Sequence, residues 1–307
     1  MTNPSEDNEV KWPSKQTELQ HQYFDSALWN DFPFRDDDIV VGTYAKSGTT
    51  WVQQIISQLI FNGAEDVDVP EISPWVDMRL PPSDQKFPAL ETQTHRRFMK
   101  THLQVDALVY SPKAKYLFVA RDGRDVVWSF YNHHANMNDI FYKAINDEIP
   151  HGMAPAIPPE DEIYEYFHRW LDNDGYPLWS FWDNIKSWWD IQHLPNFKLV
   201  HFNSLKSDLA REIREIAQFL DIAIDEQQWD AIVEHCGFDY MHANAEKSVP
   251  MGGVIWKGGA KTFINKGTNG RWRDVLTAED NHKYESLAVE KLGPECAHWL
   301  ATGELPD

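Results

Sequence analysis

The stretch VGTYAKSGTTWVQQI, Val41 to Ile55, runs from an apolar, strand-like segment through a turn and directly into a helical pattern. A glycine in such a turn lets backbone N–H groups approach a ligand, hydroxyl side chains add donors, and the N-terminus of a helix favours negative charge. The usual Walker phosphate loop needs Gly at position 47 and Lys at position 48, where Ser47 and Gly48 stand. Because Lys46 precedes the glycine here, the stretch predicts an anion site that differs from an ATP loop.

The composition favours a globular protein without a nucleic-acid partner. The chain has 307 residues, 42% of them hydrophobic and 13% aromatic, which suits one large domain or two small ones. Its net charge of −20 argues against binding to nucleic acid or to an anionic membrane, because both need a positive surface. Two cysteines, no apolar leader and no apolar run of membrane-spanning length predict a cytoplasmic location.

Strand-like segments alternate along the chain with helical patterns, which predicts an α/β domain whose parallel sheet is covered by helices on both faces. Residues 1–20 are polar and predict a flexible tail, and residues 21–307 predict the domain. Two segments rich in Pro and polar residues, 64–95 and 135–180, predict irregular insertions. The expected strands are 37–45, 96–103, 114–122 and 196–202. The expected helices are 49–63, 125–137, 158–173, 205–222, 225–238 and 278–293.

Lys46, His102 and Arg121 each follow one of the expected strands. Ligands of open parallel sheets bind at the carboxyl ends of the strands, so we expect these three side chains along one rim. Lys100 and His102 alternate with Thr101 and therefore point to the same side of the strand. A cation beside an imidazole can stabilise negative charge and remove a proton, although a surface lysine beside a structural histidine is the alternative.

Two further stretches carry positive charge. RDGRDVVWSFY starts at Arg121, a side chain suited to bidentate phosphate binding, and places Ser129 in the following helix. NKGTNGRWRD, residues 265–274, is a glycine-interrupted basic loop that can close over an anion. Taken alone, the first stretch also fits a helix capped by Asp122, and the second also fits an ordinary turn.

In combination and in this order, TYAKSGTTW, KTHL, RDGRDVVWSFY and KGTNGRW resemble the motifs of the cytosolic sulfotransferase family. The resemblance covers about residues 35 to 285, and we interpret the chain as a bacterial member. It implies a single α/β domain with a P-loop-like fold. It also implies 3′-phosphoadenosine 5′-phosphosulfate (PAPS) as sulfuryl donor, adenosine 3′,5′-bisphosphate (PAP) as product, and no metal.

The resemblance assigns catalytic roles to three residues. His102 matches the general base that takes the acceptor's proton. Lys46 matches the lysine that neutralises charge on the bridging oxygen as the sulfuryl group leaves, and Lys100 matches a lysine that stabilises the transferring group. These roles agree with elementary chemistry, because fixed cations stabilise a departing phosphate and an alcohol attacks only as its proton is removed.

The resemblance also implies a set of cofactor-binding residues. Trp51 and Phe238 match aromatic residues beside the adenine. The residues implied for the 5′-phosphosulfate are Lys46, Ser47, Gly48, Thr49, Thr50 and Trp51. Those implied for the 3′-phosphate are Arg121, Ser129, Lys266 and Gly267. The basic residues expected to make the pocket positive are Lys46, Lys100, Arg121, Arg124, Lys266, Arg271 and Arg273.

Several positions depart from the family pattern. Phe202 stands where a tyrosine usually touches the cofactor, Cys236 replaces a threonine near the adenine, and Asn265 replaces an arginine. The KTHLP form becomes KTHLQ. We expect a monomer or a homodimer, because the family's dimer motif is matched only by Arg273, Thr277, Ala278 and His282.

The aromatic residues of the two insertions predict the acceptor class, because loops on a rigid scaffold tend to determine specificity. They favour a small apolar or aromatic alcohol or amine, such as a phenol or a steroid-like or lipid-like molecule. Ordinary core packing is the alternative for each of them. The residues are Trp75, Phe87, Phe141, Tyr142, Phe167, Trp170, Trp179, Phe181 and Trp182.

Two other functions compete with sulfuryl transfer. A kinase-like phosphoryl transferase shares the strand-loop-helix layout, but the order of Lys and Gly is wrong and no strand ends in an evident magnesium-binding Asp. A non-catalytic nucleotide binder would keep the fold without turnover, and the presence of Lys46, Lys100 and His102 argues against it.

Overall fold

The computed structural model describes residues 10–305, and within that range the strands form one parallel sheet in the order β2-β1-β3-β4. Val41 pairs with Lys100 of one neighbouring strand, and Gly42 pairs with Phe118 of the other. All carboxyl ends therefore lie at one edge, which confirms the predicted α/β fold. The bounds are β1 (Ile39–Thr43), β2 (Phe98–Thr101), β3 (Lys115–Ala120) and β4 (Phe197–His201).

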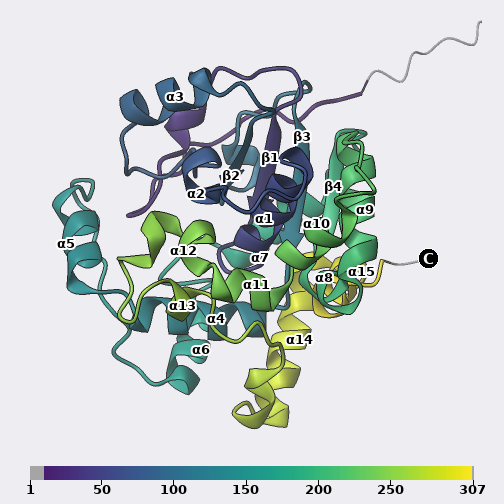
Figure 1. Cartoon of the computed structure of the whole chain (residues 1–307). Helices are drawn as coiled ribbons and strands as arrows, with labels where there is room; N and C mark the ends of the chain where they lie inside the picture. Colours follow the sequence, from purple (N-terminus) through teal and green to yellow (C-terminus); the bar gives the residue numbers. More distant parts are fainter. Residues whose placement is uncertain (1–9, 306–307) are drawn as a thin grey trace, which may run out of the picture.

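Helices surround this sheet, as Figure 1 shows, with the C-terminal pair in yellow near α8. No helix of the described residues is long and apolar enough to cross a membrane. The longer helices are α1 (Thr49–Ile60), α3 (Ser83–Thr92), α4 (Gly123–Ala135), α5 (Asp139–Asp147), α6 (Ile163–Asp172), α7 (Phe181–Trp189), α9 (Leu209–Leu220), α10 (Trp229–His235), α14 (Ala278–Leu292) and α15 (Pro294–Thr302). The short ones are η1 (Ser26–Trp29), α2 (Val69–Ile72), η2 (Val105–Ala107), α8 (Phe202–Ser207), α11 (Phe238–Ala243), α12 (Ala245–Ser248), η3 (Pro250–Gly253), α13 (Ala260–Phe263) and η4 (Arg271–Asp274).

Alternate residues of the central strands pack into two separate apolar layers. Val40 and Phe118 belong to a core cluster with α4, α7, α14 and α15. Val41 and Leu117 belong to a second cluster with α1, α9 and α10. Because successive side chains of a strand point to opposite faces, burial of all four confirms that helices cover both faces of the sheet.

A buried ion pair joins the segments that enter β1 and β2. The Nε of Arg97 donates to Oδ1 of Asp38 at 2.8 Å, and both side chains are almost fully buried. The backbone N–H of Ile39 donates to the carbonyl of Arg97 at 3.0 Å. Removal of one partner would leave a buried charge unpaired, so this contact favours the observed register of the two strands.

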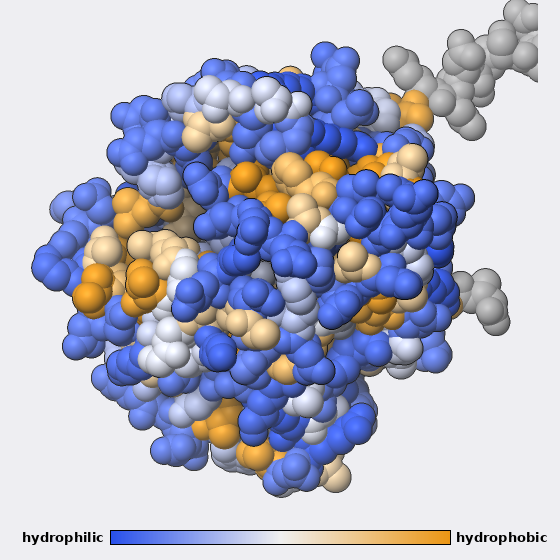
Figure 2. All heavy atoms as spheres, viewed as in Figure 1, coloured by the Kyte–Doolittle hydropathy of each residue, from blue (hydrophilic) through white to orange (hydrophobic). Residues whose placement is uncertain are grey.

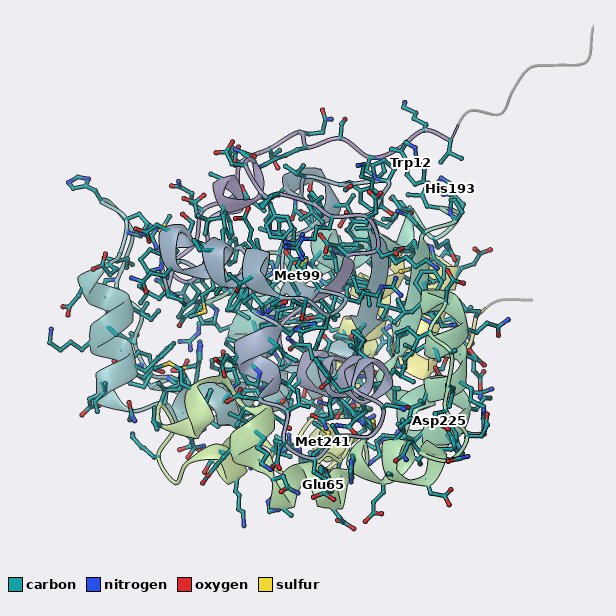
Figure 3. All side chains as sticks on the ribbon, turned by 45° about the horizontal axis from the view of Figure 1, so that its top comes forward. Trp12, Glu65, Met99, His193, Asp225 and Met241 are labelled. Carbon is teal, nitrogen blue, oxygen red and sulfur yellow. The ribbon has the colours of Figure 1, made fainter. Side chains whose placement is uncertain are left out.

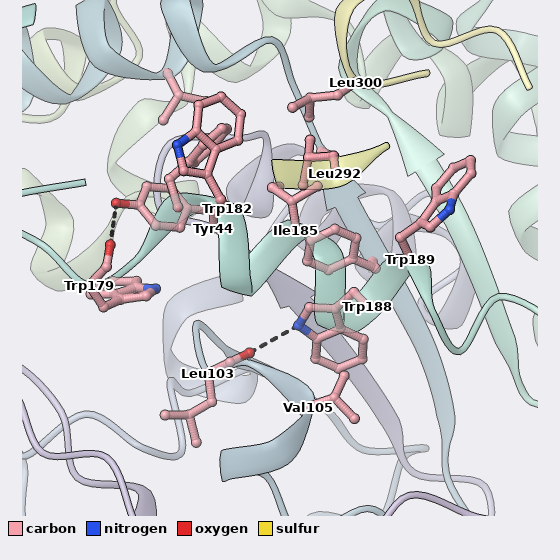
Figure 4. Packing of buried hydrophobic residues seen from close by; sticks show 14 of the residues in the cluster. Tyr44, Leu103, Val105, Trp179, Trp182, Ile185, Trp188, Trp189, Leu292 and Leu300 are labelled. Atoms are coloured by element: carbon pink, nitrogen blue, oxygen red, sulfur yellow. Dashed lines mark hydrogen bonds between the residues drawn. The ribbon is translucent and has the colours of Figure 1, made fainter. Parts of the chain in front are cut away.

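The helix α7 is a major element that the sequence pattern did not predict. Its Trp188 stacks on Phe118 of β3 at 5.2 Å between ring centroids and donates from Nε1 to the carbonyl of Leu103 at 3.0 Å. Figure 4 shows this bond beside a second one, from the hydroxyl of Tyr44 to the carbonyl of Trp179. These contacts pack α7 against the sheet and the segments that follow β1 and β2.

Other boundaries also differ from the sequence predictions. The segment 64–95, expected to be irregular, contains α2 and α3, and the segment 135–180 contains α5 as well as the expected α6. The helix expected over 205–222 is divided at Asp208, whose side chain caps α9. The helix ending at Gly293 was predicted to be the last, but α15 follows it.

The described part of the expected flexible tail, residues 10–20, contacts the body of the protein. Trp12 stacks on Tyr110 at 6.2 Å between ring centroids, and Leu19 packs against the main core. Figure 3 shows Trp12 near His193 at the periphery, whereas Met99 lies at the centre of the view. The prediction of a loose tail was therefore wrong for residues 10–20; residues 1–9 lie outside the described range.

We expect Gly42→Ala to destabilise the protein, because a Cβ there would lie 2.6 Å from Cζ2 of Trp188. Overpacking of this kind costs about 1–3 kcal/mol in the free energy of unfolding, which urea denaturation measures. Trp188→Phe removes the contacted ring atoms, so Gly42→Ala should cost less in that background. An equal cost in both backgrounds would show that the clash with Trp188 is not the cause.

Candidate active site

A cavity of about 1090 Å³ opens at the carboxyl edge of the sheet. On the face drawn in Figure 2, hydrophobic side chains border a hollow beside α5. The cavity brings together most residues that the sequence assigned to the site. These lining residues are Lys46, Gly48, Thr49, Thr50, Trp51, Lys100, His102, Arg121, Ser129, Phe202, Phe238, Asn265, Lys266 and Gly267.

Two predicted cofactor-binding side chains do not line the cavity. Ser47 is fully buried, and its Oγ has no hydrogen-bond partner among the described residues. Cys236 is fully buried in the core cluster around α1, and burial raises the pKa of its thiol. The carbonyl of Cys236 accepts a hydrogen bond from Nε1 of Trp51 at 2.8 Å. Cys236 therefore positions Trp51 through its backbone, and its thiol does not face the site as predicted.

The turn between β1 and α1 has the geometry of an anion-binding loop. Gly48, at φ 122°, has a backbone conformation that residues with a Cβ rarely adopt, and Lys46 lies in the left-handed region at φ 69°. The N-terminus of α1 has no side-chain cap. In the described structure the backbone N–H groups of Thr49, Thr50 and Trp51 have no hydrogen-bond acceptor. These free donors and the helix dipole favour a bound anion.

Three cations lie at this loop, the half-buried Lys46 and Lys100 and the buried Arg121. Burial, followed by the charges of Lys100 and Arg121, lowers the pKa of Lys46 to about 7. Burial also lowers the pKa of Lys100 to about 8, against the opposing effect of Asp77, and that of Arg121 to about 10. None of the three forms a salt bridge within residues 10–305. The site therefore fits a polyanion, which would restore these lowered pKa values.

His102 has one ring nitrogen bound and the other free. Its Nδ1 lies 2.8 Å from the carbonyl of Thr43, which can only accept, so Nδ1 carries the proton. The lone pair is therefore on Nε2, which has no partner in the described chain. Burial, followed by the charge of Lys100, lowers the pKa of His102 to about 3. The imidazole is neutral at physiological pH and able to accept a proton.

Asn269 fixes the guanidinium of Arg121 in the site. The Nε of Arg121 donates to Oδ1 of Asn269 at 2.9 Å, and its Nη2 donates to the carbonyl of Thr268 at 3.0 Å. The same loop is held by Lys206, which donates to the carbonyl of Gly267 at 2.6 Å. The loop 265–274 thus packs against Arg121 at the edge of the cavity.

Phe202 and Asn265, two positions that depart from the family pattern, both line the cavity. The ring of Phe202 lies under the guanidinium of Arg121 at 4.2 Å and contacts Trp51 edge to face at 5.2 Å. Asn265 lines the cavity, and its Oδ1 is buried without a partner among the described residues. Arg271 also lines the cavity and lowers the pKa of Arg121 by its charge. Arg271 therefore supplies positive charge that Asn265 does not.

The prediction of seven pocket cations was wrong for two of them. Arg124 forms a salt bridge to Asp122 at 2.8 Å and another to Glu285 at 3.0 Å, and it stacks on Trp272 at 3.9 Å. Arg273 does not line the cavity either. Arg124 instead ties the start of α4 to α14.

Apolar residues form much of the remaining cavity wall, called here the apolar half, which adjoins the cations because Phe263 lies under Lys46 and Trp75 under Lys100. Of the predicted aromatic residues, Trp75, Phe141 and Trp179 line it. The remaining six do not and pack in the protein interior: Phe87, Tyr142, Phe167, Trp170, Phe181 and Trp182. Further apolar lining comes from Met78, Leu80, Met137, Ile145, Ile255, Trp256 and Phe263.

Three polar residues of the site were missed in the sequence. Thr43 sets the tautomer of His102, Asn269 holds Arg121, and His133 accepts a hydrogen bond from Lys46. His133 lies in RDGRDVVWSFYNHH, one helical turn beyond Ser129, and that spacing could have indicated it. The other two act through contacts that only the folded chain defines. No group of three or more His, Cys, Asp or Glu in residues 10–305 is arranged to hold a metal ion.

Comparison with known proteins shows the family of the chain. A family model described as the sulfotransferase domain matches residues 36–294. This chain belongs to the sulfotransferase family. It is 28% identical to a glycolipid sulfotransferase of Mycobacterium bovis, covering 91% of this chain and 92% of the relative. It is 27% identical to sulfotransferase 1C2 of Rattus norvegicus, covering 85% of each.

Solved structures show the same fold. A mouse sulfotransferase complexed with PAP is similar with a TM-score of 0.68 at 22% identity, covering 89% of this chain and 91% of that one. Retinol dehydratase in a complex with retinol and PAP has a TM-score of 0.66 at 22% identity, covering 88% and 87%. The sulfotransferase fold of the chain is thus shown by structure as well as by sequence.

We expect nitrogen NMR of the imidazoles to show His102 as the neutral tautomer with its proton on Nδ1. Lys100→Met should raise the pKa of His102, because loss of a neighbouring positive charge favours the protonated ring. The exposed His193, for which no such environment exists, is the internal control. A proton on Nε2, or a pKa that Lys100→Met does not raise, would contradict this assignment.

Proposed function

We propose that this sulfotransferase moves a sulfuryl group from PAPS to the hydroxyl of a small, largely apolar acceptor, with His102 as general base. An amine is the alternative nucleophile. The observation that carries the proposal is the free Nε2 of His102, which lines the cavity between the cation-rich loop and the apolar wall. A general base needs its lone pair at the place where the acceptor loses its proton, and the tautomer of His102 provides that.

The described residues offer two anion sites for such a donor. The uncapped start of α1, with Lys46, is suited to the 5′ side. Arg121, with Ser129 and the loop residues Lys266 and Gly267, is suited to the 3′-phosphate. The aromatic rings beside them, Trp51 and Phe238, are suited to the adenine.

When bound, PAPS supplies an activated sulfuryl group on a phosphate leaving group. Lys46 and Lys100 would hold its anionic groups and supply fixed positive charge to the departing phosphate, in surroundings whose low polarity strengthens the effect. His102 would accept the proton of the acceptor hydroxyl at Nε2. Its ring would then carry a positive charge and stay held in place by the hydrogen bond from Nδ1 to the carbonyl of Thr43. The negative charge of the donor would raise the lowered pKa of His102 and make it a better base.

The apolar half of the cavity supports a lipid-like alcohol as acceptor. Its volume of about 1090 Å³, donor region included, exceeds what a nucleotide alone requires. Two of its lining residues, Ile140 and Met251, are exposed hydrophobic side chains at the mouth, which suits an acceptor with an apolar tail. The curated relative from Mycobacterium bovis is a glycolipid sulfotransferase, and this supports the same class.

We expect His102→Ala to lower turnover by about 10²- to 10⁴-fold, the usual contribution of a general base, without weakening PAP. Radiolabelled PAPS with a panel of lipid-like alcohols measures turnover, and titration calorimetry measures PAP affinity. His193→Ala, at an exposed histidine outside the cavity, is the matched control and should keep full activity. Near-normal turnover of the His102 variant would remove it from the mechanism.

Thermal stability distinguishes this proposal from the kinase-like alternative. PAP should raise the melting temperature far more than ATP with magnesium, because a 3′-phosphate can reach Arg121 and Ser129. Arg121→Met should remove most of this difference. Equal stabilisation by the two nucleotides would favour phosphoryl transfer.

A further inference from the structure

His133, on the last turn of α4, is a polar side chain in the mainly apolar half of the cavity. Nζ of Lys46 lies 3.2 Å from Nδ1 of His133 and 3.7 Å above the ring of Phe263. The imidazole packs against Trp256 at 5.1 Å and Phe263 at 5.4 Å between ring centroids. His133 therefore reaches the catalytic lysine from the acceptor side of the cavity.

The contact with Lys46 defines the tautomer of His133. When Lys46 is charged, as a bound anion would keep it, its ammonium group only donates, so Nδ1 of His133 accepts and the proton of the ring lies on Nε2. Burial, followed by the charges of Lys46, His134, Lys100 and His102, holds the pKa of His133 well below its usual value, so the ring stays neutral. No hydrogen-bond partner for this Nε2–H occurs among the described residues, and His133 lines the cavity.

The two imidazoles of the cavity consequently offer opposite groups. His102 presents a lone pair on Nε2, and His133 presents an N–H on Nε2. The charge of Lys46 lowers the pKa of both rings, so both imidazoles lie near this lysine. The indole N–H of Trp256, packed against His133, is buried in the same wall and also has no acceptor among the described residues.

We propose that His133 donates a hydrogen bond from Nε2 to a second oxygen of the acceptor, beside the hydroxyl that receives the sulfuryl group. The acceptor then has a head group with at least two oxygens, such as a polyol, on an apolar tail. The inference rests on the proposed function and adds the residue that selects the head group. An acceptor with a single hydroxyl that fills the cavity would displace water from the N–H of His133 and leave it without an acceptor.

Octyl β-D-glucoside and 1-octanol test this selection, because they share a tail and differ in the number of oxygens. The measurement is kcat/KM for each with PAPS, or the inhibition constant of 1-octanol as competitor where its turnover is slow. The ratio of kcat/KM for the glucoside to kcat/KM for octanol should fall about tenfold in His133→Phe, since the hydrogen bond from Nε2 of His133 to the second oxygen is lost. His133→Gln, which keeps an N–H, should recover part of the ratio.

His134→Phe is the matched control, because Nε2 of His134 is already bonded to the hydroxyl of Tyr23 at 3.3 Å; the ratio should stay as in the wild type. An unchanged ratio in His133→Phe, with both acceptors slowed equally, would overturn the inference and leave His133 as a positioning residue for Lys46. An absence of wild-type transfer to either acceptor would instead count against the proposed lipid-like alcohol. Melting temperatures confirm that each variant is folded.

Discussion

Lys46, Lys100 and Arg121 hold three positive charges in one buried space because parallel strands bring their carboxyl ends to the same edge. Burial of like charges without an anion opposes folding, and the lowered pKa values of all three express that cost. A chain with a net charge of −20 could have paired them with carboxylates, as it pairs Arg124 with Asp122. The cations are instead left available to a ligand, which is the usual compromise between stability and function.

The same charges act on the imidazoles around them. Burial first, and then the charges of Lys46 and Lys100, disfavour a proton on His102 and on His133, so both rings are neutral before any anion arrives. Their tautomers are then set by different partners, the carbonyl of Thr43 for one ring and the ammonium of Lys46 for the other. The same type of side chain thus offers a proton acceptor at His102 and a hydrogen-bond donor at His133, because the two rings are bonded to different partners.

The sequence predicted the sheet and most of the anion site because both depend on local pattern. Each strand is a short apolar run, and Lys46, His102 and Arg121 directly follow three of them. It missed α7 even though FWDNIKSWW places its apolar residues at 181, 182, 185, 188 and 189, the spacing of an amphipathic helix. It also misjudged Arg124, which is only three residues from Arg121, because the partner Glu285 lies far along the chain.

The acceptor half of the cavity was the least predictable part, and its construction explains why. Its walls come from segments near Trp75, Phe141 and Trp256 that are distant in sequence and meet only in the fold. An aromatic residue in an insertion can pack inward, as Trp170 does, or line the cavity, as Trp179 does, although both belong to one core cluster. For the proposed acceptor these walls favour one orientation, because Lys46 and His102 follow β1 and β2 at the sheet edge, whereas the exposed apolar side chains belong to α5 and η3. The hydroxylated end is directed to His102 and the apolar end to solvent-exposed Ile140 and Met251.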